Sequence, residues 1–555
     1  MPFVMQQPER PWPALLAADR RGVASALFGV SALALLGIIG LATQAGLWYA
    51  DYARLQTAAD AASTAGTVGI AAGESATQVA ASTTYILQQN GYVNGKNGVT
   101  VSVNAPPASG PNKGNSNAVE VLVSEQEGLT LAGLFLASAP TAKVRSVALY
   151  GANVNTCVLA LGQNLGGTNT GQVTLSGGAK LNASGCAVGT NNTGPNAFYL
   201  EPSPTVTAET IVSSGGVSSS CGQGPNGCGT TLNLTRPYSQ NHVATTDPLA
   251  AAQDAPLPDP SNFSPASGNC TTTPSFPQWN SSYALTAGTS YCGLNESGTN
   301  SVSFPGSGGT FTFTSDVNIG GSTSIASGSS SAAADIYING ALNVTSYNPT
   351  QFPAGTYHVT GGMSISSSSQ TTIDYGNIPS TFYINGNLAI SGSAQVDIPP
   401  GTYFINNGNL NISGGTSLTC SSCVAGGAGV TFVLMGNSPG IVDISGNAAA
   451  TFSAPASSNY DSGFNGIAIY EPLSNTGTNT LAGSGNLNLQ GAIYLPGAEL
   501  NVSGGAGTSS AACALIVANT IAMSGSGYAS SSKCSTYGYN WTSSGPTPNG
   551  VTIVE

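Results

Sequence analysis

The spacing of the cysteines in this sequence limits the chemistry they can do. Cys420 and Cys423 have the C-x-x-C spacing of a redox pair, but glycine-rich turns flank them where a helix N-terminus would be needed to lower the pKa of the first thiol. Zinc binding is also unsupported, because no second cysteine pair has this spacing and the only histidines are His242 and His358. We therefore predict that the cysteines form structural disulfides.

All cysteines follow residue 150 and their number is even, which is typical of an exported domain. Sequence leaves many connectivities open. Short loops close at the smallest entropic cost, so we favour bonds between neighbouring cysteines. The candidate pairs are Cys157–Cys186, Cys221–Cys228, Cys270–Cys292, Cys420–Cys423 and Cys513–Cys534.

Carboxylates are the second group of residues that could carry chemistry. Glycoside hydrolysis needs two facing carboxylates about 5 to 10 Å apart. The acidic residues after Asn262 are Glu296, Asp316, Asp335, Asp374, Asp397, Asp443, Asp461, Glu471, Glu499 and Glu555. They form no cluster in the sequence, and we interpret them as scattered, solvated turn residues. A hydrolase in which two of them meet across the fold stays an alternative.

No catalytic residue, cofactor or metal site is expected. No glycine-rich loop leads into a helix with the lysine of a phosphate-binding loop, and calcium-binding nonapeptides and EF-hand loops are absent. The net charge of -12 excludes a basic footprint for nucleic acid. Only 6% of residues are charged, so the surface must be polar through hydroxyls and amides. The expected partner is a protein or a glycan.

The N-terminal fifty residues contain a segment that can cross a membrane. From Val23 to Ala50 no residue is charged, and a bilayer core needs only about 20 apolar residues as helix. Arg20 and Arg21 precede this run, so the positive-inside rule places the short tail in the cytoplasm and the C-terminal part outside. A cleaved secretory signal is the alternative, but the run is longer than its usual apolar region and no A-x-A site is convincing.

The residues around this run carry a family resemblance. An Arg-Arg-Gly start, a Gly- and Leu-rich span and the stretch YARLQTAADAA (Tyr52 to Ala62) resemble the N-terminus of TadE/TadG-like proteins of the Tad, or Flp, pilus assembly system, most closely the TadG type. The resemblance implies a single-pass protein of the bacterial inner membrane, with pilus-assembly proteins or pseudopilins as partners. Leu27 stands five residues after Gly22, where TadE-like pseudopilins carry a Glu, so an uncleaved anchor is expected.

The next hundred residues predict a small α+β module. An interrupted stalk helix is expected over Leu55–Gln89, and residues 98–104 and 118–124 alternate as half-buried strands. A short helix, LTLAGLFLAS at 129–138, and a strand at 142–151 follow. We expect the apolar LAGLFL run to pack in the core against the strands. A partner-docking or membrane-dipping role for this run is the alternative.

Internal repeats dominate the sequence after Tyr150. Ile338 and Ile384 stand at equivalent positions of two copies 46 residues apart, and glycines before the strands recur at steps of 22, 24 and 22 residues. His358 occupies the position of Phe404 in the next copy, so we interpret it as a structural ring. Short strands at this period predict a parallel β-helix, expected to be right-handed, rather than a β-sandwich. The expected interior residues include Leu342, Val344, Leu388, Ile390, Leu410 and Ile412.

The sequence therefore predicts a mainly β protein in which a transmembrane helix and a small α+β pseudopilin-like module precede a parallel β-helix solenoid. The predicted domains are a cytoplasmic tail at 1–21, the transmembrane helix at 22–50, the stalk helix and Tad-like module at 51–150, and the β-helix at 151–555, with a Pro-rich segment at 237–266 crossing its surface.

We interpret the protein as a membrane-anchored, non-enzymatic structural component of a Tad/Flp-type pilus assembly or adhesion system, with its β-helix in the periplasm or outside the cell. One alternative is a glycan-binding adhesin, whose clustered aromatic candidates are Trp279, Tyr283, Tyr539 and Trp541. A polysaccharide lyase or hydrolase is the other alternative. A lyase would lack its usual base, because no Lys or Arg lies between Arg236 and Lys533.

Overall fold

In the computed structural model the chain forms two compact units. The first contains residues 1–153 and 548–555, and the second contains residues 154–547. Described residues are 21–528 and 551–554, with gaps at 73, 115–117, 130, 135, 151–155, 163–171, 223–224, 226, 236–237, 239, 241–243, 329–331, 367, 376–377, 484–486 and 505–512. The predicted cytoplasmic tail therefore lies outside the described residues, apart from Arg21.

The first unit is built on one continuous helix, α2 (Arg21–Ala71), which no proline interrupts. Its second half packs on the sheet through residues spaced at helical period, namely Leu55, Ala58, Ala59 and Ala62, all 0–2% exposed. A second helix, α3 (Ala76–Gln89), begins at a capping box in which the Ser75 N–H donates to Gln78 Oε1 at 2.9 Å. Gly66 allows α2 and α3 to approach, because a side chain there would collide with Thr83.

An antiparallel sheet completes this unit and confirms the predicted α+β module. Its strands are β1 (Thr100–Asn104), β2 (Ala118–Gln126), β3 (Thr141–Tyr150) and β40 (Val551–Ile553), in the order β1-β2-β3-β40. The last strand comes from the other end of the chain, because Ala148 of β3 pairs with Ile553. The sequence assigned these C-terminal residues to the β-helix, and that assignment is wrong for β40.

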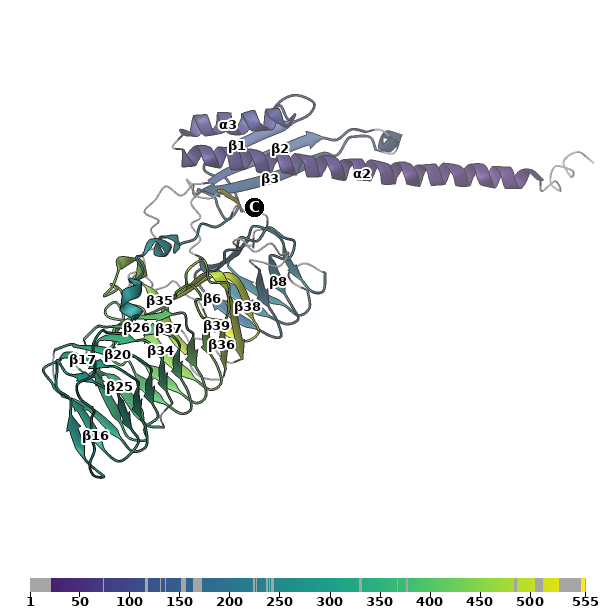
Figure 1. Ribbon diagram of the computed structural model, residues 1–555. Coiled ribbons are helices and arrows are strands. Elements are labelled where there is room, and N and C mark those ends of the chain that lie inside the picture. The colour runs from purple at the N-terminus through teal and green to yellow at the C-terminus, as the bar shows by residue number, and fades with distance from the viewer. Residues whose placement is uncertain are drawn as a thin grey trace, which may run out of the picture. The chain divides into compact units, whose positions relative to one another are not determined.

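The second unit is a parallel β-helix, as predicted, and its strands form three faces (Figure 1). In spatial order the first face contains β14 (Ser290–Tyr291), β17 (Gly309–Phe313), β20 (Ala334–Ile338), β23 (Gly355–Val359), β26 (Ser380–Asn385), β29 (Gly401–Asn406), β32 (Val430–Met435), β35 (Ile467–Tyr470), part of β37 (Leu487–Gly504), part of β38 (Ala514–Met523), β4 (Thr156–Ala160), β7 (Ala187–Thr190) and β10 (Ile211–Ser213).

The other two faces follow the same order of coils. The second contains β15 (Leu294–Glu296), β18 (Val317–Ile319), β21 (Leu342–Val344), β24 (Met363–Ile365), β27 (Leu388–Ile390), β30 (Leu410–Ile412), β33 (Val442–Ile444), β36 (Thr478–Gly483), parts of β37 and β38, β5 (Val173–Leu175), β8 (Phe198–Leu200) and β11 (Val217–Ser219). The third contains β13 (Ser282–Ala284), β16 (Ser301–Phe304), β19 (Ser324–Ser327), β22 (Thr350–Pro353), β25 (Gln370–Tyr375), β28 (Gln395–Asp397), β31 (Ser417–Thr419), β34 (Ala449–Ser453), part of β37, β39 (Ser526–Tyr528), β6 (Lys180–Ala183), β9 (Thr205–Ala208) and β12 (Thr231–Leu234).

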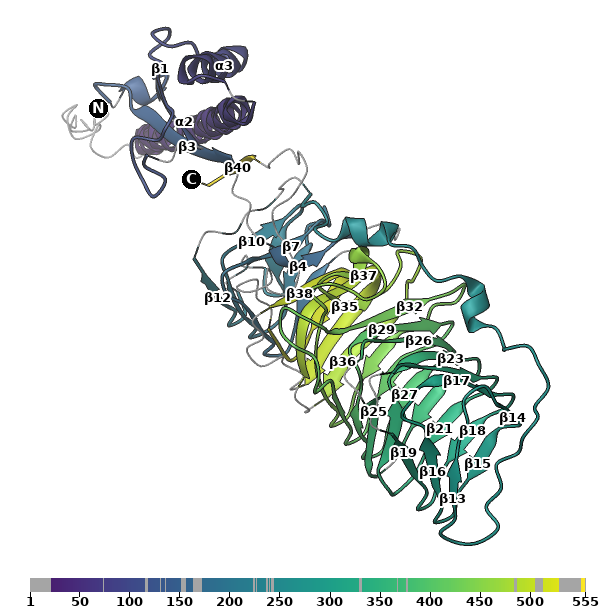
Figure 2. The same ribbon diagram turned by 90° about the vertical axis from the view of Figure 1, so that its left-hand side faces the viewer.

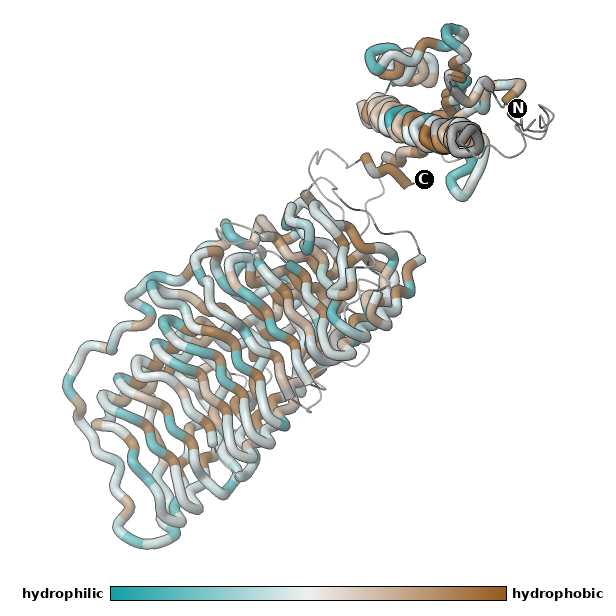
Figure 3. Tube along the Cα trace, turned by 90° about the vertical axis from the view of Figure 1, so that its right-hand side faces the viewer, coloured by the Kyte–Doolittle hydropathy of each residue, from teal (hydrophilic) through white to brown (hydrophobic). Residues whose placement is uncertain are grey.

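The repeat spacing produces an in-register apolar interior. Leu388 pairs with Leu410, and Ile390 pairs with Ile412. Hydrophobic positions therefore recur from coil to coil along the solenoid (Figure 3). The predicted interior residues Leu342, Val344, Leu388, Ile390, Leu410 and Ile412 are 0–4% exposed, which confirms their placement.

The coils are not stacked in the order of the sequence. β38 pairs with β4 and β5, and β39 pairs with β6, so the last coil of the β-helix stacks on the first. Here we call this contact the junction. The chain consequently enters and leaves the β-helix at neighbouring strands, and the two end coils contain β10–β12 and β13–β15.

A segment on the outside of the coils links the two ends of the β-helix (Figure 2). We call residues 244–266 the strap; it contains two short 3-10 helices, η2 (Ala250–Asp254) and η3 (Pro260–Phe263). Its first part is bonded to Asn191, since the Thr245 N–H donates to Asn191 Oδ1 at 2.7 Å. Its last residue, Ala266, donates to Asn339 Oδ1 at 2.7 Å. The strap thus runs from the β7 coil toward the β20 coil.

Candidate functional site

The first half of α2 is long and apolar enough to cross a membrane. Large apolar side chains on it stand clear of the protein, among them Phe28 (75% exposed), Leu35 (59%) and Ile38 (63%). The second half of the same helix, by contrast, is buried against the sheet at Leu55 and Ala59. A core helix would bury both halves, so the exposed half is a candidate membrane anchor.

A buried carboxylate organises the sheet of the module. Glu120 is fully buried and accepts hydrogen bonds from the Ser109 hydroxyl, the Ala108 N–H (2.9 Å), Asn104 Nδ2 (2.8 Å) and Arg145 Nε (2.8 Å). Burial on its own would raise the pKa of Glu120, but the four donors together lower it to about 2. The group is therefore an ionised structural element that ties the loop after β1 to β2 and β3.

Four of the five predicted cysteine pairs are disulfides in the structure: Cys157–Cys186, Cys221–Cys228, Cys270–Cys292 and Cys420–Cys423. Cys513 is also disulfide-bonded, whereas Cys534 lies outside the described residues. The C-x-x-C pair closes a single turn after β31, and Cys420 is 8% exposed. This pair therefore occupies a structural position in the coil.

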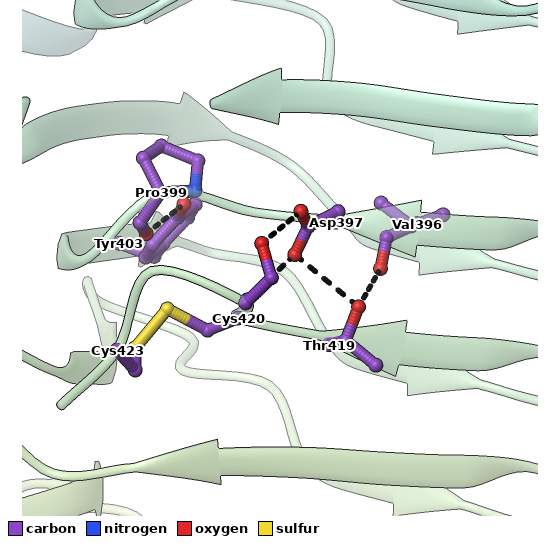
Figure 4. Close-up of a disulfide and its surroundings, with 8 residues drawn as sticks. Val396, Asp397, Pro399, Tyr403, Thr419, Cys420 and Cys423 are labelled. Carbon is purple, nitrogen blue, oxygen red and sulfur yellow. Dashed lines mark hydrogen bonds between the residues drawn. A yellow bond between two sulfur atoms is a disulfide. The ribbon is translucent and has the colours of Figure 1, made fainter. Parts of the chain in front are cut away.

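Asp397 holds the turn that contains this disulfide (Figure 4). Its carboxylate accepts hydrogen bonds from the Thr419 hydroxyl at 3.2 Å, the Ser421 N–H at 2.8 Å and the Ser421 hydroxyl at 2.5 Å. Asp397 thus links one coil to the next. Asp397 is the half-buried last residue of β28 and Asp374 lies within β25, so the assignment of these two carboxylates to turns is wrong.

A second carboxylate that the sequence placed in solvent is buried under the strap. Glu471 is fully buried beside β35, and burial raises its pKa to about 8, although a hydrogen bond from Asn479 to Oε2 at 3.1 Å opposes this shift. Its other oxygen, Oε1, has no hydrogen-bond partner. Burial therefore favours the protonated form of Glu471. No pattern in the sequence distinguished it from the exposed acids.

The strap contacts the coil next to Glu471 through polar groups. The Leu473 N–H donates to Gln253 Oε1 of the strap at 3.0 Å, and the Tyr494 hydroxyl donates to Asp247 Oδ2 at 2.7 Å. Burial raises the pKa of Asp247, while hydrogen bonds from the Leu249 N–H and from Tyr494 oppose the rise. These hydrogen bonds hold the strap on the coil, and they give Gln253, Asp247 and Tyr494 a structural role.

His358 belongs to a ladder of rings, which confirms its interpretation as a structural residue. Its ring stacks on Tyr337 at 4.4 Å and on Tyr383 at 4.9 Å, and Tyr383 stacks on Phe404. Its Nδ1 lies 2.8 Å from the backbone oxygen of Asn262 in the strap, an acceptor, so Nδ1 carries the proton. Burial lowers the pKa of His358. His242 lies outside the described residues.

Metal-binding clusters and exposed aromatic rings are the remaining features that could form a site. Within the described ranges, no group of three or more His, Cys, Asp or Glu side chains could hold a metal ion. Trp279, near the end coil, is 80% exposed. Tyr283 instead packs near Phe276, with ring centroids 5.9 Å apart. The remaining two aromatic candidates, Tyr539 and Trp541, lie outside the described residues.

Comparison with family models gave a match over residues 22–80, to the family described as putative Flp pilus-assembly TadE/G-like. No curated protein and no solved structure matched the chain. The matched residues cover nearly all of α2 and the start of α3. They include both the exposed apolar half of α2 and the half that packs on the module. Residues 22–80 are therefore TadE/G-like, and the same chain carries a β-helix after them.

Proposed function

We propose that this protein is a membrane-anchored, non-enzymatic structural component of a Tad/Flp-type pilus assembly or adhesion system. The observation that carries the proposal is the TadE/G-like match over the helix whose first half is apolar and exposed. The anchor lies in the bacterial inner membrane with its N-terminus in the cytoplasm, because Arg20 and Arg21 precede the apolar run. The disulfides fit an oxidising compartment on the opposite side.

The β-helix is a separate compact unit of the same chain. It is inserted between β3 and β40 of the module, so two chain connections tether it. The carboxylates with a described buried or bonded environment, such as Glu471 and Asp397, have structural explanations. Pilus-assembly proteins or pseudopilins are the proposed partners of the module.

Co-purification of the tagged, full-length protein from membranes of its native cell tests this function. We expect pilus-assembly proteins to be recovered with it. The matched control replaces residues 22–80 with an unrelated single-span anchor and should lose these proteins while keeping the β-helix. Recovery of none of them with the native protein would contradict the proposal. Alkaline phosphatase fused after Tyr150 should be active, which tests the orientation separately.

Glycan binding is a second candidate, favoured by the exposed ring of Trp279 near the end coil. Aromatic faces are common platforms for sugar rings, and the Trp279 side chain is open to solvent. Binding of the purified protein to an array of glycans should then fall on Trp279→Ala. No binding by the native protein would remove this candidate.

A further inference from the structure

The tip of the β2–β3 hairpin lies beside α2 rather than over the sheet. We define the hairpin tip as the 3-10 helix η1 (Leu131–Leu134) together with Leu129 and Leu136. The hairpin runs along α2, and η1 contacts that helix (Figure 1). The described residues of the hairpin tip belong to neither hydrophobic cluster of the module. Within the LAGLFL run Ala132 is buried and Leu136 is exposed, whereas the side chains of Leu131, Leu134 and Phe135 lie outside the described residues, so packing of this run in the core against the strands stays a prediction.

Two side chains of α2 fix the level at which the hairpin tip lies. Gln44 Nε2 and Trp48 Nε1 both donate to the backbone oxygen of Gly128, at 3.1 Å and 3.2 Å. Gln44 is only 4% exposed. Gly40, one turn nearer the N-terminus on the same side of the helix, is also buried, whereas Gly46 is exposed. This side of α2 is thus buried from Gln44 to Gly40, and η1 is the element of the hairpin that contacts the helix.

The level of Gly40 falls within the hydrocarbon core for every placement of the span, and the level of Gln44 falls within it when the core ends at Gln44 or beyond. The uncharged run extends from Val23 to Ala50, and a hydrocarbon core takes about 20 residues of helix. A core of that length placed anywhere in the run has its outer end at Ala42 or beyond. Gly40 is then inside the core, and the hairpin tip, which contacts α2 through η1 and through Gly128, lies at or next to the outer end of the core.

The chemistry of the hairpin tip suits this depth. No residue from Gly128 to Ala142 is charged. Leu136 is apolar yet 44% exposed. Backbone groups that enter lipid must be bonded internally, and here the Gly128 oxygen receives two donors and the Leu136 N–H donates to the Ala132 oxygen at 2.8 Å. Such a loop can enter hydrocarbon without leaving these polar groups unpaired.

We propose that the hairpin tip inserts into the lipid bilayer beside α2, in the half nearest the module, and so gives the module a second contact with the membrane. A single helix leaves a domain free to rotate about the helix axis and to tilt. A second apolar contact removes that freedom and presents a fixed face of the module along the membrane. This inference rests on the proposed function, because it requires α2 to span a bilayer.

Lipid quenching of a fluorophore on the full-length protein tests the proposal. Three variants each receive one cysteine labelled with an environment-sensitive dye: Leu136→Cys in the hairpin tip, Leu35→Cys in the span, and Thr77→Cys at the exposed start of α3. Each protein is reconstituted in phosphatidylcholine vesicles with and without lipids that carry a nitroxide on the acyl chain. All three sites are exposed, so the substitutions should leave the fold intact.

We expect the emission at Leu136→Cys to shift to the blue and to lose intensity with nitroxide lipids, as at Leu35→Cys, while Thr77→Cys keeps its intensity. If Leu35→Cys is quenched and Leu136→Cys behaves like Thr77→Cys, the hairpin tip is outside the lipid and this inference is wrong. If Leu35→Cys is not quenched, the membrane span itself fails, and with it the proposed anchoring. A blue shift at Leu136→Cys without lipid quenching would indicate contact with protein and would also overturn the inference.

Discussion

Two kinds of stacking hold the coils of the β-helix together. Between β13 and β37 each coil stacks on the next coil in the sequence, as where Leu388 pairs with Leu410. At the junction, Ile516 of β38 pairs with Val158 of β4, so the end of the β-helix sequence stacks on its beginning. Both contacts are parallel ladders of backbone hydrogen bonds. They differ in how much chain must be ordered before the ladder can close.

This difference separates local from global stability. Neighbouring coils of a solenoid can form and propagate locally. Closing a long loop costs additional chain entropy, and contacts far apart in sequence form slowly. The coils that contain β4 to β12 depend on the junction for their stacking surface. We call the coils from β13 to β37 the continuous stack, and we expect it to persist when the junction opens. Four predictions examine how the coils are held together.

The largest effect is expected inside the continuous stack. Leu388→Asp places an unpaired carboxylate between Met363 and Leu410, its partners in the adjacent coils. Breaking the apolar interior in this way should cost about 3–5 kcal/mol, or force the carboxylate to protonate. Limited proteolysis should then cut the coils on both sides. Ala389→Asp, one residue away on the outward side of β27, is the control and should stay resistant.

The next prediction compares the two kinds of stacking directly. Leu159→Ala at the junction and Leu410→Ala in the continuous stack each remove a buried leucine side chain, which should cost about 2–5 kcal/mol. Hydrogen exchange should show that Leu159→Ala frees residues 156–235 while residues 309–412 stay protected. If Leu159→Ala loosens both regions to the same extent, the β-helix is a single cooperative unit and the comparison fails.

The sequence predicts the continuous stack because the spacing of its repeats shows which residues of successive coils are aligned. The distance of 46 residues between Ile338 and Ile384 places equivalent residues above one another, and Leu388 and Leu410 follow from the same spacing. The junction has no such copy. Ile516 and Val158 are two ordinary β-branched residues, and nothing in their neighbourhoods marks them as partners.

Other features could not be predicted because they also depend on contacts between residues that are distant in the sequence. β40 is only three residues long, too short to show alternation, and its partner β3 is at the other end of the chain. The burial of Glu471 depends on the strap, which is distant in sequence. The apolar run at the hairpin tip had three explanations, namely core packing, partner docking and membrane insertion, because its composition suits all of them. Composition predicts that a residue is apolar, but the fold decides what covers it.

A third prediction concerns pH at the coil beneath the strap. The pKa of Glu471 is about 8 in the folded protein and near 4.5 in the unfolded chain, so the folded state binds the extra proton between these values. Its contribution is most favourable below pH 4.5 and is lost as the pH rises to about 8, by at most about 1.4 kcal/mol per pH unit. Glu471→Gln should remove this slope in denaturant titrations. An equal change of slope in Glu499→Gln, which removes a carboxylate from neighbouring β37, would contradict the assignment to Glu471.

The place where stability is lost when Glu471 ionises also tests whether one coil can open while the others stay folded. Ionised Glu471 should loosen the β35 coil and the strap bonded to it through Gln253, because an unpaired charge in that place demands water. Hydrogen exchange at pH 8.5 against pH 6, corrected for the intrinsic rate, should therefore accelerate in residues 467–481. Residues 309–412 should keep their protection in the native protein. Equal acceleration in both regions would show that no local opening precedes global unfolding.

The smallest effect is expected where one coil is tied to the next by a side chain. Asp397→Asn keeps one oxygen that can accept a hydrogen bond but removes the charge that strengthens the three contacts to Thr419 and Ser421. The turn closed by the Cys420–Cys423 disulfide should become more mobile, with a loss of about 1 kcal/mol in the free energy of unfolding. Asp397→Ala leaves the Ser421 N–H without its acceptor and should lose more. If both variants match the native protein in stability and in exchange at residues 419–421, the backbone ladder alone holds these coils, and side-chain ties add nothing to the continuous stack.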